Sequence, residues 1–436
     1  ELTVKQLFAG LYANTDINEE PMSAGRQMGA HFNTVSLNKD GSWRDLVNLK
    51  NSSSDVSCTG SQMPRLLGLA QASKLYRKIK TKNSSKFSKN GNEVAWGTIG
   101  NASTSEGIFF EVLNAAGVHQ VPLVISIWDD DYGISVENKD QTIKESISKA
   151  LSGFQRNKSE SGFEILTVKG WDYPALINTY QKANDIARDK HIPVIVHVTE
   201  LTQPIGHSTS GSHERYKTRD RLDWEKNNDC NIKMKSWIIE NNIAIESELE
   251  LIENESKEHV KKSKTEAWNT YLDPIKKSQN ELLSILNKIK SENNSDLLID
   301  EINKLKKIKE PNNKDLLSTS RKLLRNLINI KSLNINSLKE WNKNYKRFHE
   351  EIFSSKLYNE FSTNYKNVKE VKPIYDETSK NVDGRIILRN NFKKLFETYD
   401  NLLVFGEDTG KIGDVNQGLE GLQDIFGSER VADRGI

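Results

Sequence analysis

Acidic residues follow a short apolar run in a pattern that could hold a metal ion. The run is Val121–Trp128, and Asp129, Asp130 and Asp131 come directly after it. Three consecutive carboxylates repel one another, so they are tolerated where they are solvated or where a cation binds among them. Mg2+ prefers hard oxygen ligands and often bridges to the phosphates of a bound molecule. An acidic surface turn is the alternative interpretation of this pattern taken alone.

Small residues follow an earlier apolar run and could approach a phosphate. Gly100, Asn101, Ala102 and Ser103 are small enough to let backbone N–H groups come close to phosphate oxygens, and the N-terminus of a following helix adds partial positive charge. Ser103 and Glu106 have the Ser-x-x-Glu spacing of a capping box, which predicts a helix that begins near Ser103. An ordinary tight turn between a strand and a helix is the alternative.

Three residues of these two segments form a predicted magnesium site. Asn101 can offer a side-chain carbonyl oxygen, Asp130 a carboxylate and Tyr132 a backbone carbonyl. Adjacent parallel strands end at the same edge of a sheet, where ligands bind, so the two runs would bring these groups together.

Apolar runs alternate with helix-like stretches in the first 235 residues. The runs are rich in Val and Ile and are bounded by Gly, Pro or Asp, as buried strands are. They cover Glu93–Ile99, Val121–Trp128, Phe163–Val168 and Ile192–Val198. Helical spacing is found over Met63–Lys80, Glu106–Gly117, Gln141–Phe154 and Tyr173–Asp189. The alternation predicts an α/β fold, a parallel sheet with helices on both faces.

The chain changes character after this region. Residues 236–365 are rich in Lys, Glu, Asn and Leu and keep a helical period, which predicts long surface helices. We interpret 236–374 as a helical connector; a coiled-coil surface is the alternative, although heptads are not sustained. A second α/β unit begins at Tyr375, with a helix over Ile386–Tyr399 and a strand over Asn401–Phe405.

Composition narrows the class of protein. The 62 basic and 60 acidic residues nearly cancel and no segment is uniformly basic, so nucleic acid is not a favoured partner. The apolar runs are too short to span a bilayer, and no signal peptide stands at the start. Two distant cysteines, Cys58 and Cys230, do not make a disulfide framework and favour a cytoplasmic protein. The chain begins at Glu1 and ends in a strand-like pattern, so we expect both ends to be cut.

The two polar segments together resemble the thiamine-diphosphate motif, a Gly-Asp-Gly turn followed about thirty residues later by an Asn. Here Asp130 follows Asn101 by 29 positions. The surrounding sequence is similar to the alpha subunit of 2-oxoacid dehydrogenases. The usual Asp is Asn101 and the usual Asn is Asp130, so the two residue types have exchanged places and one anionic ligand remains. The resemblance implies that residues 1–235 bind thiamine diphosphate and Mg2+.

Two further segments extend this resemblance. The polar loop 201–217 is similar to the family's active-site loop, which implies that His207 donates or accepts a proton near the reacting carbonyl and that Arg215 faces phosphate. A solvated loop histidine is the alternative for His207. Ser57 and Thr59 lie in a segment similar to the turn that holds the thiamine ring, which implies cofactor binding; a helix cap is the alternative.

The ends of the chain resemble other parts of the same family. Residues 25–32, Gly-Arg-Gln-Met-Gly-Ala-His-Phe, resemble the branched-chain type more than the pyruvate type. Leu402–Ile436 resembles the beginning of the beta subunit, which implies a fused alpha and beta chain, an incomplete beta-type, transketolase-like domain over 375–436, and a place for Glu407 near the thiamine ring. The resemblance covers roughly 1–270 and 375–436.

The function that this resemblance implies is decarboxylation of a 2-oxo acid, of the 3-methyl-2-oxobutanoate type, with transfer of the acyl group to the lipoyl domain of a partner acyltransferase. A pyruvate dehydrogenase component, a transketolase-like enzyme and a non-catalytic subunit kept for assembly are the alternatives. The Gly-His-Ser sequence at 206–208, within the polar loop, argues against the transketolase-like enzyme. We expect a homodimer of the full-length fused chain. We also expect this chain alone to be inactive, because it ends before the glutamate that promotes thiamine activation in the family.

Overall fold

The structure of the protein is a computed structural model. It describes residues 2–26, 33–38, 40–53, 56, 58–207, 213–293, 295–330, 332–354 and 365–435. Internal contacts divide the chain into two compact units, one of residues 1–33 and 250–374 and the other of residues 34–249 and 375–436. The predicted domain boundaries at 235 and 374 stay predictions.

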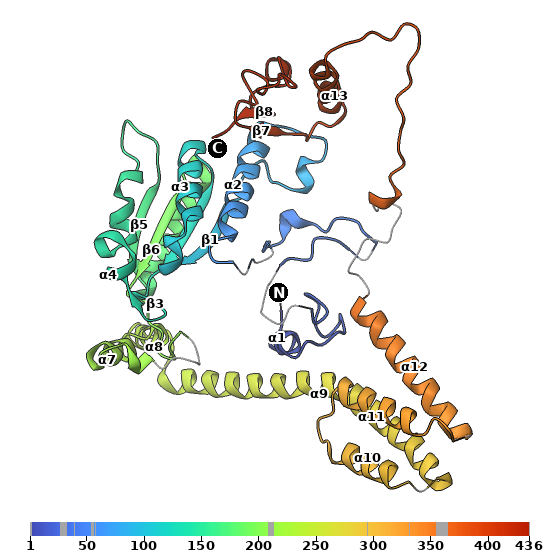
Figure 1. The fold of residues 1–436 in the computed structure, drawn as a ribbon. Helices are drawn as coiled ribbons and strands as arrows, with labels where there is room; N and C mark the ends of the chain where they lie inside the picture. Colours follow the sequence, from blue (N-terminus) through green and yellow to red (C-terminus); the bar gives the residue numbers. More distant parts are fainter. Residues whose placement is uncertain are drawn as a thin grey trace. The chain divides into compact units, whose positions relative to one another are not determined.

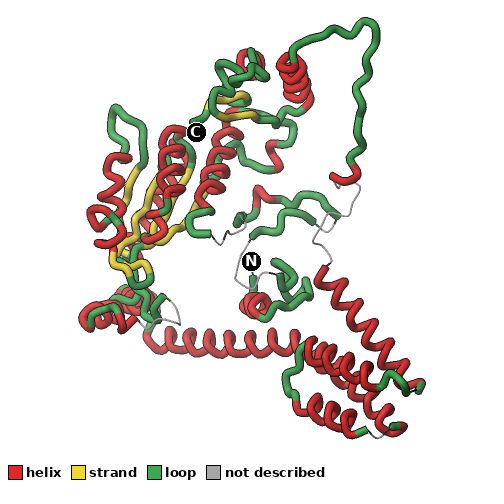
Figure 2. The backbone as a smooth tube through the Cα atoms, in the orientation of Figure 1, coloured by secondary structure: helices red, strands yellow, loops and turns green. Residues whose placement is uncertain are grey.

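A parallel sheet lies at the centre of the second unit (Figures 1 and 2). Its order is β1 (Ala95–Gly100), β2 (Leu123–Trp128), β6 (Val194–Thr199) and β5 (Glu164–Lys169), with neighbouring strands parallel. Each strand lies within two residues of a predicted apolar run, so the predicted parallel sheet is confirmed. Val and Ile dominate the two central strands, β2 and β6, because these strands are buried on both faces.

Helices cover both faces of this sheet. α2 (Gln62–Lys78) and α3 (Gly107–His119) pack on one face, in a core that includes Ile125 and Ile127 of β2. α6 (Tyr173–Lys190) packs on the other face, in a core that includes Val124. Successive residues of a strand point to opposite faces, so β2 contributes to both cores.

The predicted helix over Gln141–Phe154 is wrong. The structure has instead α4 (Asn138–Gln141), a 3-10 turn over Ile143–Glu145, α5 (Ile147–Ala150) and a 3-10 turn over Leu151–Phe154. Lys144 and Glu145 have φ angles of 61° and 55°, in the left-handed region. A left-handed residue ends the helical hydrogen-bond pattern, so the segment folds as short turns although its apolar residues have helical spacing.

The first unit is a set of helices with its own core. They are α1 (Val4–Leu11), α9 (Glu246–Glu292), α10 (Asp296–Lys307), α11 (Asn313–Asn326) and α12 (Leu333–Ser354). The predicted long helices are confirmed, but from Ile275 onwards α9 shares a buried core with α10, α11 and α12, in which Leu282, Leu286, Leu323 and Leu338 are fully or almost fully buried. We call this core the bundle core. By contrast, every residue from 250 to 262 of α9 is exposed.

Other elements complete the second unit. α7 (Arg219–Asn227) and α8 (Cys230–Glu240) follow the sheet in sequence. The segment from 375 contains α13 (Gly384–Thr398), β7 (Val404–Gly406), α14 (Leu422–Phe426) and β8 (Val431–Asp433), and β7 pairs in parallel with β8. Phe396, Leu419, Leu422 and Val431 form a small core there. Among the described residues, no helix has the length and apolar character needed to cross a membrane.

Candidate functional site

The ends of three neighbouring strands meet at one edge of the sheet. Gly100 lies opposite Trp128 in the pairing of β1 with β2, and the Asn101 N–H donates to the Trp128 carbonyl at 3.1 Å. The Asp129 N–H donates to the Val198 carbonyl of β6 at 2.9 Å. The expectation that adjacent parallel strands bring the two polar segments together is therefore confirmed.

The three residues of the predicted metal site are linked through Tyr132, which contacts both Asn101 and Asp130. Asn101 donates from Nδ2 to the Tyr132 carbonyl at 3.1 Å, and the Tyr132 N–H donates to Asp130 Oδ1 at 3.3 Å. Asn101 is 5% exposed and Asp130 9% exposed. The contact places an amide, a carboxylate and a backbone carbonyl at one largely buried point, while their role as metal ligands stays a prediction.

The three consecutive carboxylates have different partners. Asp129 Oδ2 lies 2.8 Å from His197 Nε2, and Asp131 Oδ2 lies 2.6 Å from Arg221 Nη1. Asp130 has no ion-pair partner within 4 Å among the described residues. A buried carboxylate without a paired cation is unfavourable, so Asp130 is the one of the three that a bound cation would stabilise most.

The pKa shifts of these carboxylates follow from their partners. Burial raises the pKa of Asp130 above its usual value, and the Tyr132 N–H and the charge of Lys217 only partly oppose this effect. Burial would also raise the pKa of Asp129, but the hydrogen bonds from His197 and Asn138 outweigh it and the pKa lies below its usual value. The neighbours of Asp129 therefore favour its charged form, whereas the burial of Asp130 disfavours its charged form.

The oxygen atoms at this point fit a magnesium ion. Both hydrogens of Asn101 Nδ2 are used, on the Tyr132 carbonyl and on Asn138 Oδ1, and Asn101 Oδ1 accepts no hydrogen bond from any described residue. Asn101 Oδ1, the Asp130 carboxylate and the Tyr132 carbonyl are the hard oxygen donors that Mg2+ prefers. No cluster of three or more His, Cys, Asp or Glu side chains suited to a metal occurs in the described part of the chain, so an amide and a carbonyl would have to contribute.

The turn after β1 differs from the prediction. Ala102–Ser105 forms a 3-10 turn, and α3 begins at Gly107 with Glu106 as its N-cap residue and no side-chain cap. The predicted capping box is therefore wrong. The Glu106 N–H donates instead to the Ser103 carbonyl at 3.2 Å, because the 3-10 turn closes the backbone first. A Cβ at Gly100 would meet only Ser103 Oγ, at 4.0 Å, so the backbone at Gly100 is open to a ligand.

A glycine holds the second polar segment against this turn. β3 (Tyr132–Gly133) pairs antiparallel with β4 (Val136–Glu137). A Cβ at Gly133 would lie 2.7 Å from the Ala102 Cβ and 2.7 Å from Gln141 Oε1, which is closer than side chains approach. Only glycine allows this close packing, and the packing keeps the Tyr132 carbonyl beside Asn101.

Sequence reasoning missed the cations that flank the strand end. Lys217 Nζ lies 2.6 Å from Glu225 Oε1, and both side chains are only 1% exposed. Arg221 donates to the Asp130 carbonyl oxygen at 2.8 Å, in addition to its ion pair with Asp131. The spacing of Arg221 and Glu225, four residues apart on a helix, is the signal that could have indicated this cluster. Arg215, the cation that we predicted, is exposed.

The remaining predicted residues do not join this contact network. Thr59, His207 and Glu407 are exposed, and no hydrogen bond or ion pair links their side chains to Asn101 or Asp130 among the described residues. Ser57 lies outside the described residues. The assigned roles of these residues stay predictions.

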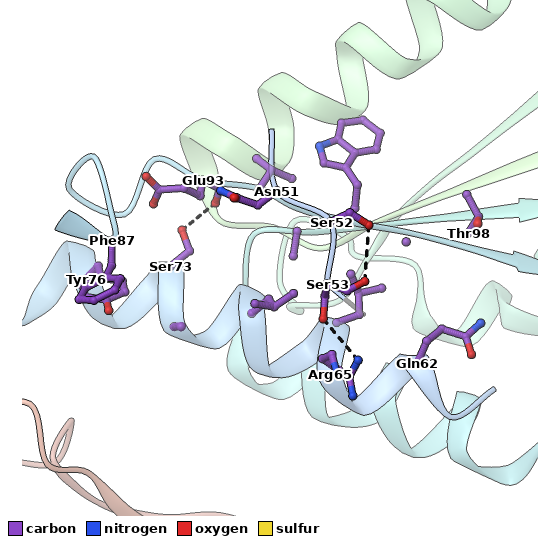
Figure 3. A pocket seen from close by; sticks show the side chains of 17 residues that line it. Asn51, Ser52, Ser53, Gln62, Arg65, Ser73, Tyr76, Phe87, Glu93 and Thr98 are labelled. Atoms are coloured by element: carbon purple, nitrogen blue, oxygen red, sulfur yellow. Dashed lines mark hydrogen bonds between the residues drawn. The ribbon is translucent and has the colours of Figure 1, made fainter. Parts of the chain in front are cut away.

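A cavity lies between α2 and β1 (Figure 3). Its volume is about 750 Å³. Gln62, Arg65 and Thr98 lie toward one end, and Tyr76 and Phe87 lie toward the other. Because Thr98 precedes Gly100 by two residues in β1, the Thr98 end of the cavity lies near the open backbone at the strand end.

The fold and the strand-end site define an α/β protein of the kind that binds a ligand at the C-terminal edge of a parallel sheet. The chain belongs to the dehydrogenase E1 component family, whose family model matches residues 36–275. This finding confirms the resemblance to 2-oxoacid dehydrogenases.

Relatives with assigned functions include both substrate types. The chain is 25% identical to the pyruvate dehydrogenase E1 component subunit alpha of Rickettsia bellii. The match extends over 205 residues and covers 47% of this chain and 56% of the relative. It is 24% identical to the 2-oxoisovalerate dehydrogenase subunit alpha of Bacillus subtilis. This match extends over 239 residues and covers 55% of this chain and 61% of the relative. The chain thus spans between about half and three fifths of the length of these two relatives.

Proposed function

We propose that this protein binds thiamine diphosphate through Mg2+ at the ends of β1 and β2 and acts as the decarboxylating component of a 2-oxoacid dehydrogenase complex. The single observation that carries the proposal is the buried Asp130 carboxylate, which lacks an ion-pair partner among the described residues and lies beside the Asn101 amide and the Tyr132 carbonyl. A divalent cation bound by these oxygens would neutralise Asp130 and would carry the charge needed to bind a diphosphate.

The residues of this chain would bind and orient the cofactor. Thiamine diphosphate, when bound, supplies the electron sink that decarboxylation of a 2-oxo acid requires. The open backbone at Gly100, with Ala102 and Ser103 in the turn that follows, would approach the diphosphate. The cavity beside β1 would accept the part of the cofactor beyond the diphosphate. His207 would move a proton near the reacting carbonyl, and Glu407 would lie near the thiamine ring.

The substrate and the partners are the finer part of the proposal. We favour a branched-chain 2-oxo acid of the 3-methyl-2-oxobutanoate type, because residues 25–32 resemble that group of enzymes. The acyl group would pass to the lipoyl domain of a partner acyltransferase, in the cytoplasm, from a homodimer of the fused chain. A pyruvate-specific component and a non-catalytic subunit with a role in assembly are the alternatives.

Calorimetry on the intact protein tests the cofactor site. Thiamine diphosphate should bind tightly with Mg2+ present and weakly without it. Asp130→Ala should weaken this Mg2+-dependent binding by about 100-fold or more, since even partners behind the direct ligands change metal affinity by about 10–100-fold. Asp140→Ala, a change of an exposed aspartate in the nearby α4, is the matched control and should have no effect. Equal binding with and without Mg2+ would overturn the proposal.

Steady-state kinetics on the intact protein separate the alternatives. A larger kcat/KM for 3-methyl-2-oxobutanoate than for pyruvate supports the branched-chain assignment, and the reverse order supports the pyruvate-type component. Cofactor binding without turnover of either acid would favour the assembly role.

A further inference from the structure

The direction of one side-chain amide decides whether Asn101 can bind a cation. The two ends of an asparagine amide have nearly the same shape, but only the oxygen can be a metal ligand. Asn101 Nδ2 donates to Asn138 Oδ1 at 2.9 Å and to the Tyr132 carbonyl at 3.1 Å. These two acceptors take up both hydrogens of the nitrogen, and the Asn101 oxygen accepts no hydrogen bond from a described residue, so it is available to a cation.

The direction of Asn138 is fixed in turn by Asp129. Asn138 Nδ2 donates to Asp129 Oδ1 at 2.9 Å, and the same oxygen accepts the Asp131 N–H at 2.9 Å. A backbone N–H can only donate, so Asp129 Oδ1 is an acceptor and Asn138 must present its nitrogen there. Its oxygen therefore faces Asn101, and Gln141 Nε2 donates to that oxygen at 3.0 Å as well.

A histidine of a third strand holds the other end of this chain of hydrogen bonds. His197 Nε2 lies 2.8 Å from Asp129 Oδ2, and His197 Nδ1 lies 2.8 Å from Ser148 Oγ. His197, Asp129, Asn138 and Asn101 are all buried, at 1% to 7% exposed. Water therefore competes little for these bonds, and the polarity of the chain is set by its members.

We infer that Asn138, held by Asp129, is a positioning residue that keeps the oxygen of Asn101 turned to the metal site. The inference rests on the proposed function, because it requires a cation bound at Asn101. The Tyr132 carbonyl also accepts from Asn101, but it is itself a predicted ligand of the cation. Asn138 is thus the hydrogen-bond partner of Asn101 that a bound cation would not occupy.

A carboxylate at position 101 would not need this positioning. It has an oxygen at both ends, so either direction offers a ligand to a cation. One of its oxygens would also face Asn138 Oδ1, and two acceptors in contact repel each other. The direction of the Asn138 amide therefore suits an asparagine at position 101 and opposes an aspartate there.

Four forms of the intact protein test this inference with Mn2+ as the probe. They are the unchanged protein, Asn138→Leu, Asn101→Asp and the protein with both substitutions, each with thiamine diphosphate present. The concentration of free Mn2+, measured by its electron paramagnetic resonance signal, gives the affinity without any assay of activity. Asn138→Leu should weaken Mn2+ binding by about 10–100-fold when residue 101 is Asn. The same substitution should leave the affinity unchanged or increase it when residue 101 is Asp.

The outcomes are distinguishable. An equal loss in both backgrounds would mean a merely structural role for Asn138, and no loss in the Asn101 background would mean no role; either result overturns the inference. Failure of the unchanged protein to bind Mn2+ would overturn the proposed function instead.

Two further variants guard the test against misfolding. Gln120→Leu is the matched control: it removes two hydrogen bonds just beyond the C-terminal end of α3 and should not change Mn2+ affinity. If Asn138→Leu does not fold, as thermal unfolding would show, Asn138→Ser takes its place. A serine hydroxyl can donate as well as accept, so it would not fix the direction of the Asn101 amide. The loss of Mn2+ affinity is therefore again expected with Asn at position 101 and not with Asp.

Discussion

The strand-end site and the bundle core stabilise their surroundings in different ways. At the strand ends the buried groups are amides, carboxylates and cations, and each contact depends on charge and on which atom donates. In the bundle core the buried groups are mostly Leu and Ile, and contacts depend on volume. The difference teaches that removal of a charged or hydrogen-bonding partner should matter most at the strand ends, whereas removal of apolar volume should matter most in the bundle.

The largest expected loss of free energy of unfolding is at Glu225, the buried ion-pair partner of Lys217. Glu225→Ala leaves the Lys217 ammonium, 1% exposed, without its carboxylate. Removing one partner of a buried ion pair lowers the free energy of unfolding by about 3–5 kcal/mol. Urea denaturation measures this change.

The control for Glu225 lies on the same helix. Asp223 pairs with Arg219 on the surface of α7, so Asp223→Ala should change the free energy of unfolding by less than about 1 kcal/mol. If Glu225→Ala itself lowered the free energy of unfolding by less than about 1 kcal/mol, buried charge at the strand end would contribute no more than a surface ion pair, and the comparison would fail.

The matching test of the bundle core is a change of volume. Leu282 is fully buried in α9, and Leu282→Ala should lower the free energy of unfolding by about 2–5 kcal/mol through lost apolar contacts and a cavity. Leu251→Ala, at an exposed position of the same helix, should change it by less than about 0.5 kcal/mol. Mg2+-dependent cofactor binding should be the same in both variants, and its loss in Leu282→Ala would show that the two regions are coupled.

The smallest effect on the free energy of unfolding is expected at Glu20, a buried carboxylate of the helical unit that accepts hydrogen bonds from its neighbours. Its oxygens accept the N–H groups of Met22, Ser23 and Gly25 at 2.8–2.9 Å. Burial would raise the pKa of Glu20, but these bonds, with that of the Ser23 hydroxyl, outweigh it and the pKa lies below its usual value. Glu20→Gln should lower the free energy of unfolding by about 1.5 kcal/mol at pH 7.

The pH dependence of this difference follows from the sign of the pKa shift. A carboxylate with a folded-state pKa below its unfolded value of about 4.3 stabilises the fold above that pH and loses this contribution as the pH falls through the folded-state pKa. Urea unfolding from pH 7 to pH 3 should therefore show the stability gap between the unchanged protein and the Glu20→Gln variant closing in acid. Glu19→Gln, at a surface pair with Lys5, is the control. A gap that stays constant with pH would contradict the assignment.

Local patterns predicted the sheet and the meeting of Asn101 with Asp130. Runs of Val and Ile identify buried strands. Parallel pairing of β1 with β2 then fixes the positions of the residues that directly follow each strand. The same patterns failed over Gln141–Phe154, where Lys144 and Glu145 adopt left-handed backbone that periodicity does not report.

Tertiary contacts account for what the sequence did not indicate. Arg221 reaches Asp131 across 90 positions of the chain, and His197 reaches Asp129 across 68. His197 did carry a signal, because it is a polar residue within the apolar strand β6. A buried histidine in such a strand requires a polar partner, and the nearby Asp129 was the available one.

The exposed stretch of α9 has a consequence of its own. Residues 250–262 have no buried side chain, so tertiary packing contributes little to their helical state. Pairs such as Glu253 with Lys257 and Glu258 with Lys261 remain, each contributing about 0.2–0.5 kcal/mol and weakened by salt. In this stretch, ionic strength therefore affects helicity by screening the ion pairs, whereas charge screening does not weaken the apolar contacts that hold α9 from Ile275 onwards.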